Sequence, residues 1–246
     1  MASLRGRARS KEVGGLIVQL RAKNSETRRR AAVELGEIGD PAATEPLIQA
    51  IGRGGGERAR RAATVALSKI GRPAVPSLLR ALHRGYNLFC RSSAADALSL
   101  IGDPRAVPAL LRSARDPSTV VRLWSAVALG RLRDRRAIPT LIRGLRDESG
   151  GVRLQSAAAL SGLRTPRAVN PLAVVLVSDP KWYVRQQAAR TLRILGDSRA
   201  LPALRAAEND PRPAVAREAG RALEALGPTR RASRSRETRR RPRTGR

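Results

Sequence analysis

The chain has 246 residues, which is long enough to bury a substantial hydrophobic core. Aromatic residues make up only 2% of it, so the core must be built from Ala, Leu, Val and Ile, which favours close-packed helices and argues against an aromatic-rich β-sandwich. The formal net charge is +29, almost all of it from arginine, and this favours an anionic partner such as nucleic acid, an acidic protein or an anionic membrane surface.

Residues 1–12 are basic and are followed by no apolar stretch of the kind that a secretory signal needs, so we expect a basic N-terminal extension, with the start of an organelle transit peptide as the alternative. The longest apolar run, residues 172–177, is much shorter than the roughly 20 residues of a membrane-spanning helix. Cys90 is the single cysteine, which excludes an internal disulfide and favours a reducing, cytoplasmic location. We therefore predict a cytoplasmic protein without a membrane span.

One pattern recurs from residue 13 to residue 227. Its most regular position is a leucine that returns every 31 or 32 residues. The members of this leucine column are Leu35, Leu67, Leu98, Leu129, Leu160, Leu192 and Leu223. A fixed period of this length is typical of stacked structural repeats, in which no unit can bury its apolar face alone.

Each repeat contains a proline that precedes an apolar stretch, as at Pro108 and Pro139, and proline is favoured in the first turn of a helix. The spacing predicts a short first helix at the proline and a longer second helix through the leucine column. Asp116 is the expected N-cap of one second helix, and Asp103 that of a first helix. The chain is therefore predicted to be all-α, a right-handed α-solenoid of about seven helix pairs.

The pattern D-P-x-x-V-R-x-x-A-A-x-x-L followed by G-D-x-R-A-x-P-x-L, seen at residues 178–204, resembles HEAT repeats. It is similar in particular to the short HEAT class found in phycobilisome lyase subunits. The resemblance covers residues 13–227 and implies an α-α superhelix, but no residue can be matched to a bilin-handling role. HEAT-like deoxyhypusine hydroxylases depend on repeated His-Glu pairs, which this chain lacks.

Catalytic chemistry is not indicated, and we expect no catalytic residues, no metal and no cofactor. His83 is the only histidine, so clusters of His and Cys ligands cannot form. It is expected to be solvent-exposed at a helix end, and Cys90 to be a small buried hydrophobe. Trp182 and Tyr183 are interpreted as packing residues, with base stacking as the alternative.

A first arginine column lies early in each second helix, at Arg28, Arg60, Arg91, Arg122, Arg153 and Arg185. The HEAT resemblance implies that such arginines pair with the loop aspartate of the same or the adjacent unit as a structural ladder. The pairs six residues apart that fit are Asp116 with Arg122, Asp147 with Arg153 and Asp179 with Arg185. Arg60 and Arg91 lack an equivalent aspartate and are predicted to be available to ligands.

A second arginine column, which we call the rim, precedes the first helices. It comprises Arg105, Arg136, Arg167 and Arg199. A line of positive charge here is a candidate polyanion-binding surface, and the alternative is that these arginines are merely solvated. Arg80, Arg112 and Arg143 form a shorter stripe on the first helices themselves.

The exposed side of the middle second helices is apolar, at Leu123, Trp124, Val127 and Leu154, and predicts a protein-binding patch in the concave groove. Residues 228–246 hold nine arginines and one glutamate and are predicted to be a disordered tail. The preferred function is a non-enzymatic scaffold for an anionic macromolecule, namely nucleic acid, ribonucleoprotein or acidic protein. The alternative is a protein adaptor or lyase-like subunit that uses the apolar groove.

Overall fold

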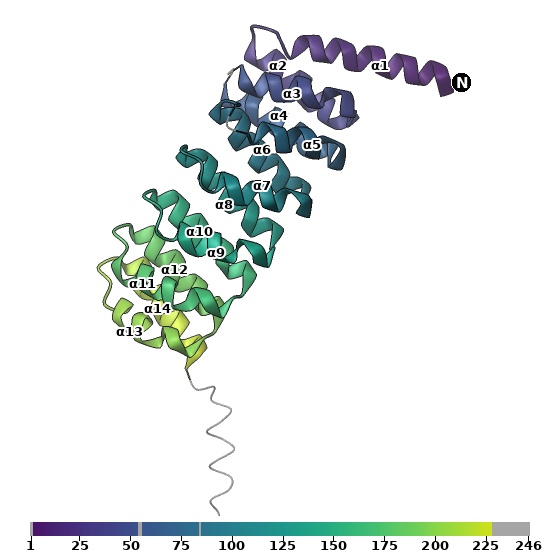
Figure 1. The fold of residues 1–246 in the computed structure, drawn as a ribbon. Coiled ribbons are helices and arrows are strands. Elements are labelled where there is room, and N and C mark those ends of the chain that lie inside the picture. The colour runs from purple at the N-terminus through teal and green to yellow at the C-terminus, as the bar shows by residue number, and fades with distance from the viewer. Residues whose placement is uncertain (1, 54–55, 84, 228–246) are drawn as a thin grey trace, which may run out of the picture. The chain divides into compact units, whose positions relative to one another are not determined.

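The computed structural model describes residues 2–53, 56–83 and 85–227, and within these ranges the chain contains α-helices and short 3-10 turns but no strand (Figure 1). Two compact units are present, unit 1 (residues 1–163) and unit 2 (residues 164–246). The predicted tail at 228–246 and the loop residues Gly54 and Gly55 lie outside the described residues. The all-α prediction is confirmed.

Unit 1 contains five helix pairs. Its first helices are α1 (Ala2–Gln19), α3 (Thr44–Gly52), α5 (Val75–Ala81), α7 (Val107–Ser113) and α9 (Ile138–Gly144). Its second helices are α2 (Ser25–Ile38), α4 (Glu57–Ile70), α6 (Leu88–Ile101), α8 (Thr119–Leu132) and α10 (Gly150–Leu163). Unit 2 contains the pairs α11 (Val169–Ser178) with α12 (Trp182–Leu195) and α13 (Leu201–Ala207) with α14 (Pro213–Leu226). The described chain thus has the predicted seven pairs.

Six 3-10 turns precede the first helices α3, α5, α7, α9, α11 and α13. They are η1 (Pro41–Ala43), η2 (Arg72–Ala74), η3 (Pro104–Ala106), η4 (Arg135–Ala137), η5 (Pro166–Ala168) and η6 (Ser198–Ala200). At η3 the prediction that Asp103 caps a first helix holds in this form, since its carboxylate accepts a hydrogen bond from the Arg105 N–H. Each turn delivers the chain into the proline-containing first turn of the next helix.

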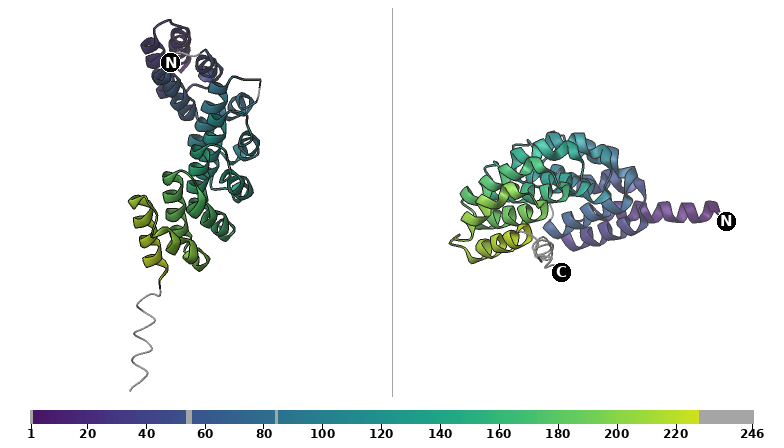
Figure 2. Two further views of the ribbon diagram at one scale, coloured as in Figure 1. Left: turned by 90° about the vertical axis from the view of Figure 1, so that its left-hand side faces the viewer. Right: turned by 90° about the horizontal axis from the view of Figure 1, so that it is seen from below.

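Within unit 1 each second helix packs directly on the next, from α2 to α10, and each first helix packs on its own partner (Figure 2). The leucine column fills the space between these layers, and Leu35, Leu98 and Leu160 are fully buried. Close approach depends on small residues, because a Cβ added at Gly130 of α8 would lie 2.7 Å from Ala159 Cβ of α10. Helices that meet at such positions leave no room for a larger side chain.

The starts of the second helices differ from the prediction. Asp116 is not the N-cap of α8, which begins at Thr119 after Ser118. Its carboxylate instead accepts the Ser118 N–H at 2.8 Å and shapes the turn that leads into the helix. Aspartate readily accepts a hydrogen bond from the backbone N–H two residues ahead. The aspartate that the sequence suggested as a helix cap therefore stabilises the turn before the helix.

Candidate functional site

The first arginine column forms ion pairs between neighbouring repeats. Arg91 Nε lies 2.9 Å from Asp116 Oδ2, and Arg122 Nε lies 2.8 Å from Asp147 Oδ2. All four side chains are nearly buried, with exposed fractions between 3% and 13%. The prediction that Arg91 is available to ligands is therefore wrong, because the aspartate of the following loop occupies it.

The side chains of Arg122 and Arg185 do not pair with the aspartates six residues earlier, and instead use the other pairing that the resemblance allows, with the aspartate of the adjacent unit. Each carboxylate partner lies 25 residues later, as in the 2.7 Å contact between Arg185 Nε and Asp210 Oδ2 of unit 2. The aspartate six residues earlier is still contacted, but through its backbone, since Arg122 Nη1 donates to the Asp116 carbonyl at 3.1 Å. One guanidinium thus joins its own loop to the next.

These contacts hold the ladder carboxylates in the charged form. Burial raises the pKa of Asp147, but hydrogen bonds from Arg122 and from the Ser149 N–H more than offset this and leave the pKa below its usual value. Hydrogen bonding from Arg185 likewise lowers the pKa of Asp210. Because the ladder arginines are neutralised and nearly buried, we assign them a structural role.

Arg60 differs from Arg91, Arg122 and Arg185 of the same column. Its guanidinium carbon lies 4.8 Å from the centre of the Phe89 ring, and Arg60 makes no ion pair with any described residue. A cation over an aromatic face gains about 0.5–1 kcal/mol at exposed sites. Arg60 is therefore positioned beside an apolar surface with its charge unneutralised.

The rim arginines of unit 1 are paired. Arg105 Nη2 lies 2.7 Å from Asp103 Oδ2, and Arg136 Nη2 lies 2.7 Å from Asp134 Oδ2. Side-chain and backbone hydrogen bonds from Arg105 lower the pKa of Asp103 to about 2. Both arginines are exposed, but each carries its own counter-charge two residues earlier.

The rim arginines of unit 2 differ from each other. Arg199 Nη2 lies 2.6 Å from Asp197 Oδ2 and also donates to the Pro166 carbonyl at 3.2 Å. Arg167 has Thr165 two residues before it, where each other rim arginine has an aspartate, and it is exposed without an ion pair to the described residues. Only this member of the rim carries an uncompensated charge within the part of the chain that the structure describes.

The predicted apolar groove residues are half-buried. Leu123 packs near α10, where a Cβ added to Gly151 would lie 3.1 Å from Leu123 Cδ1. Val127 and Leu154 are half-buried as well. Trp124, the fourth predicted residue, lines a pocket on this face.

That pocket, which we call the second-helix pocket, has a volume of about 450 Å³ and is formed by α4, α6 and α8. Its apolar lining is largely exposed and consists of Val65, Leu88, Phe89, Leu100, Val120 and Trp124. Its charged lining consists of Glu57, Arg60, Arg61, Asp96 and Arg131. The sequence pattern did not predict the contribution of α6. Leu88 and Phe89 lie at the very start of that helix, whereas the predicted groove residues lie further along α8 and α10.

Asp96 is the half-buried acid of the second-helix pocket. Burial raises its pKa, although the positive charges of Arg131 and Arg61 act in the opposite direction. Arg131 Nη1 lies 3.6 Å from Asp96 Oδ1 and donates to Ser99 Oγ at 2.8 Å. Arg131 is thus occupied, whereas Arg61 is exposed and has no ion pair among the described side chains.

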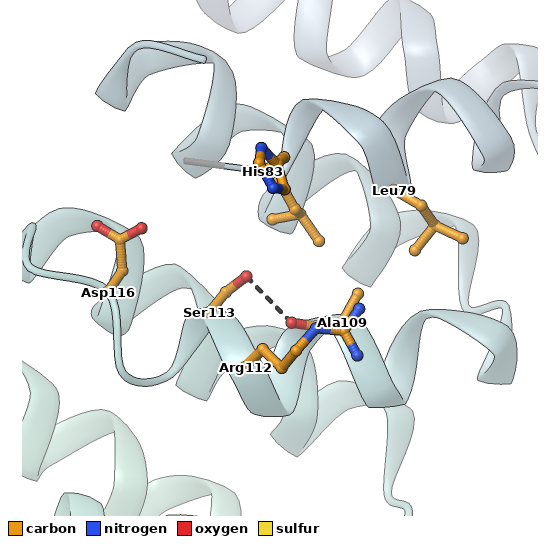
Figure 3. Close-up of a pocket in the computed structure, with 7 residues that line it drawn as sticks. Leu79, His83, Ala109, Arg112, Ser113 and Asp116 are labelled. Carbon is orange, nitrogen blue, oxygen red and sulfur yellow. Dashed lines mark hydrogen bonds between the residues drawn. The ribbon is translucent and has the colours of Figure 1, made fainter. Parts of the chain in front are cut away.

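A second pocket, of about 360 Å³, lies between α5 and α7 (Figure 3). His83 lines one side of it, exposed just beyond the end of α5 as predicted, and Arg112 lines the other. Ser113 Oγ donates to the Ala109 carbonyl at 3.1 Å, and the Asp116 carboxylate is held by the ladder. The Ser113 hydroxyl is thus directed to a backbone carbonyl.

The remaining sequence candidates are also placed. Cys90 is buried, and this burial raises the pKa of its thiol, so it behaves as the predicted small hydrophobe. Trp182 is 41% exposed and meets Tyr183 edge-to-face, with ring centres 6.0 Å apart. Across residues 2–53, 56–83 and 85–227, no group of three or more His, Cys, Asp or Glu side chains could hold a metal ion.

No helix in the described part of the chain is long and apolar enough to cross a membrane. The paired helices, the proline-led first turns and the ladder define an α-solenoid repeat protein. The family model for HEAT repeats matches residues 13–99, 74–130, 90–161, 113–193 and 169–234. The chain therefore belongs to the HEAT-repeat family.

Solved structures share the fold. The YibA protein of Escherichia coli is 18% identical, with a TM-score of 0.58, over 89% of this chain and 82% of that one. A computationally designed armadillo repeat protein for modular peptide recognition is 19% identical, with a TM-score of 0.50, over 87% and 99%. The CpcE and CpcF complex of phycocyanin lyase from Nostoc is 25% identical, with a TM-score of 0.49, over 86% and 92%. No curated protein sequence matches the chain significantly.

Proposed function

We propose that this chain is a non-enzymatic binding scaffold whose second-helix pocket holds an acidic segment of a protein partner. The observation that carries the proposal is the composition of that pocket, in which exposed apolar side chains lie beside Arg60 and Arg61. Exposed apolar patches rimmed by polar groups mark interaction sites on soluble proteins. A peptide supplies both apolar anchors and carboxylates, whereas a phosphate backbone supplies only the anion.

The groove residues Leu123, Val127 and Leu154 extend this surface along α8 and α10 as flanking contacts. Trp124 is the expected anchor, because tryptophan in a partly enclosed pocket is typical of binding hot spots. Its replacement by Ala is expected to weaken binding about thirtyfold, which corresponds to about 2 kcal/mol at such a position.

Intrinsic fluorescence offers a direct test, because the chain has two tryptophans and only Trp124 lines the pocket. In the Trp182→Phe variant, titration with a peptide rich in Glu, Leu and Phe should shift or quench the emission of Trp124. The same peptide with Lys in place of Glu should bind much more weakly.

The matched control is Trp124→Phe, which leaves Trp182 in unit 2 as the reporter and should show no change at the same peptide concentrations. Val120→Glu should abolish the Trp124 response, while Val174→Glu, at an exposed valine of α11, should not. An equal response from both tryptophans, or indifference to Val120→Glu, would remove the pocket from the proposal.

In this proposal the rim is an accessory surface that binds polyanions. Arg105, Arg136 and Arg199 keep between 52% and 62% of their side chains exposed, so each could exchange its carboxylate partner for a phosphate. Arg167 needs no such exchange. Arg167→Gln should therefore weaken any rim-dependent binding more than Arg136→Gln, as measured by the retention of the variants on heparin.

A further inference from the structure

The ends of α7 and α9 carry four exposed arginines at equivalent positions of successive repeats, which we call the outer arginine cluster: Arg112, Arg115, Arg143 and Arg146. Arg112 and Arg143 lie in the last turns of these helices. Arg115 and Arg146 follow in the next turn, where their N–H groups donate to the Arg112 and Arg143 carbonyls at 3.0 and 2.9 Å. The cluster lies on the first-helix layer, whereas the second-helix pocket is formed by the other layer.

The outer arginine cluster has no acidic partner among the described residues. Its side chains make one hydrogen bond there, from Arg143 Nη2 to Thr140 Oγ1 at 3.4 Å. The acids of the adjoining loops are already used, since Asp116 is held by Arg91, and Asp147 and Glu148 by Arg122. The loop carboxylates that could balance these arginines are therefore already paired with arginines of the ladder.

The like charges also interact. Burial and the positive charge of Arg115 both lower the pKa of Arg143, which shows that the two guanidinium groups from adjacent repeats are close enough to repel. Repulsion of this kind disfavours the folded state slightly and is relieved when an anion binds between the charges.

Two arginines at one helix end are not a general property of the repeats. The residue of α5 equivalent to Arg112 is Arg80, which pairs with Glu45, and the equivalent residue of α3 is Ala50. In α11 of unit 2 the equivalent of Arg143 is Val175. Among the described repeats, arginine at both positions is found at the ends of α7 and α9 and at no other first helix.

The surroundings indicate what kind of anion fits. None of the described exposed large hydrophobic residues lies on α5, α7 or α9, so the cluster lacks the apolar side chains that membrane-surface helices insert. No aromatic residue lies on α7 or α9 that could stack on a base. Beside Arg112 the pocket of Figure 3 adds His83 as a further polar side chain facing solvent.

We propose that the outer arginine cluster binds the sugar-phosphate backbone of a nucleic acid without reading its base sequence. Guanidinium groups match phosphate oxygens in geometry as well as charge. Four arginines on two adjacent helix ends, with helices packed roughly 8–10 Å apart, present a surface that spans more than one phosphate. Binding through phosphates alone positions a nucleic acid but carries no sequence information.

The test measures binding of the full chain to a fluorescein-labelled duplex of about 20 base pairs by anisotropy, between 50 and 200 mM KCl. All four cluster arginines are changed to Gln. The control variant changes four exposed arginines of unit 2 to Gln and so loses the same net charge: Arg190, Arg205, Arg212 and Arg217.

At 100 mM salt the cluster variant should lose at least tenfold in affinity, and the slope of log K against log salt should fall by about 3–4, since each phosphate contact contributes about 0.9. The control variant should change little, and a scrambled duplex should bind equally well. Equal losses in both variants would mean that net charge alone drives binding and would overturn the proposal.

Two further outcomes would also overturn it. The first is a purely structural role, in which arginines at the helix C-termini offset the helix dipole and do nothing else. In that case the cluster variant would lower the melting temperature and leave duplex binding intact. Loss of binding to phosphatidylserine vesicles, with duplex binding retained, would assign the cluster to a lipid surface. The proposal expects an unchanged or slightly higher melting temperature, because the repulsion between Arg115 and Arg143 is removed.

Discussion

Replacement of Arg122 by Met should test the structural role of the ladder. The variant leaves the Asp147 carboxylate, whose side chain is 13% exposed, without its two hydrogen bonds of 2.8 and 2.9 Å. Breaking a buried ion pair costs about 3–5 kcal/mol, and we expect about 3 kcal/mol here because the Ser149 N–H still reaches Asp147 at 3.0 Å. With an m-value of about 3 kcal/mol/M, the urea midpoint should fall by about 1 M.

The matched control is Arg136→Met, which removes the same side chain from an ion pair whose arginine is 59% exposed. Exposed pairs contribute about 0–1 kcal/mol, so the midpoint should move little. If both variants lose the same stability, the difference that we draw between the ladder and the rim is wrong.

The pH dependence of the same variant supplies an independent check. Because the folded-state pKa of Asp147 is lowered, its pairing stabilises the folded state above its unfolded-state pKa of about 3.9 and is lost as the pH falls through the folded value. The stability gap between the natural chain and Arg122→Met should therefore narrow in acid. A gap that is equally wide at pH 7 and pH 3 would contradict the assignment.

Three further predictions follow from single positions. Gly130→Ala should destabilise the fold by about 1–3 kcal/mol in chemical unfolding, although Ala favours helix, because the new Cβ would lie 2.7 Å from Ala159 Cβ. Arg133→Gly should raise the melting temperature, since Arg133 has φ of 51° and non-glycine residues pay roughly 1 kcal/mol there; a fall would show that its side chain contributes more than the strain. In an NMR titration the Asp103 carboxyl should titrate near pH 2, and Arg105→Met should raise that value toward the usual 3.9 or so.

The repeat was readable from the sequence because the packing requirement leaves a strict period. Leu67, Leu98 and Leu129 must each fill the same buried space, so their spacing predicts the number of helix pairs and the position of the core. The proline of each first helix is equally constrained by the missing N–H. The leucine spacing is periodic and the proline preference is local, and both can be recognised in the amino-acid sequence alone.

The ladder partner was not readable in the same way. Arg122 has Asp116 six residues before it and Asp147 25 residues after it, and both are near in space because the repeats stack. The spacing in the sequence does not show which of these two carboxylates the arginine contacts. In the structure Arg122 contacts Asp116 through its backbone carbonyl. Only the packed structure shows which of the two carboxylates the guanidinium faces.

The second-helix pocket is formed by α4, α6 and α8, whereas the sequence pattern predicted an apolar patch on α8 and α10. The apolar residues of α8 and α10 looked exposed in a helical projection, but adjacent second helices pack so closely that Leu123 lies against Gly151. The side chains at the start of α6, Leu88 and Phe89, project beyond this packing and remain exposed. Exposure in a solenoid depends on the neighbouring helix as well as on the helical face.

The arginines show the same principle for charge. The net charge of +29 does not show how the arginines differ in burial and in pairing. Arg122 is neutralised and nearly buried, Arg136 is neutralised and exposed, and Arg143 is exposed beside another arginine without a described acidic partner. Because the aspartates near these positions already pair with ladder or rim arginines, positive charge remains on arginines that have no described acidic partner. We expect an external anion to gain most at arginines of this kind, which include Arg167 of the rim, those at the ends of α7 and α9, and Arg60 and Arg61 beside the second-helix pocket.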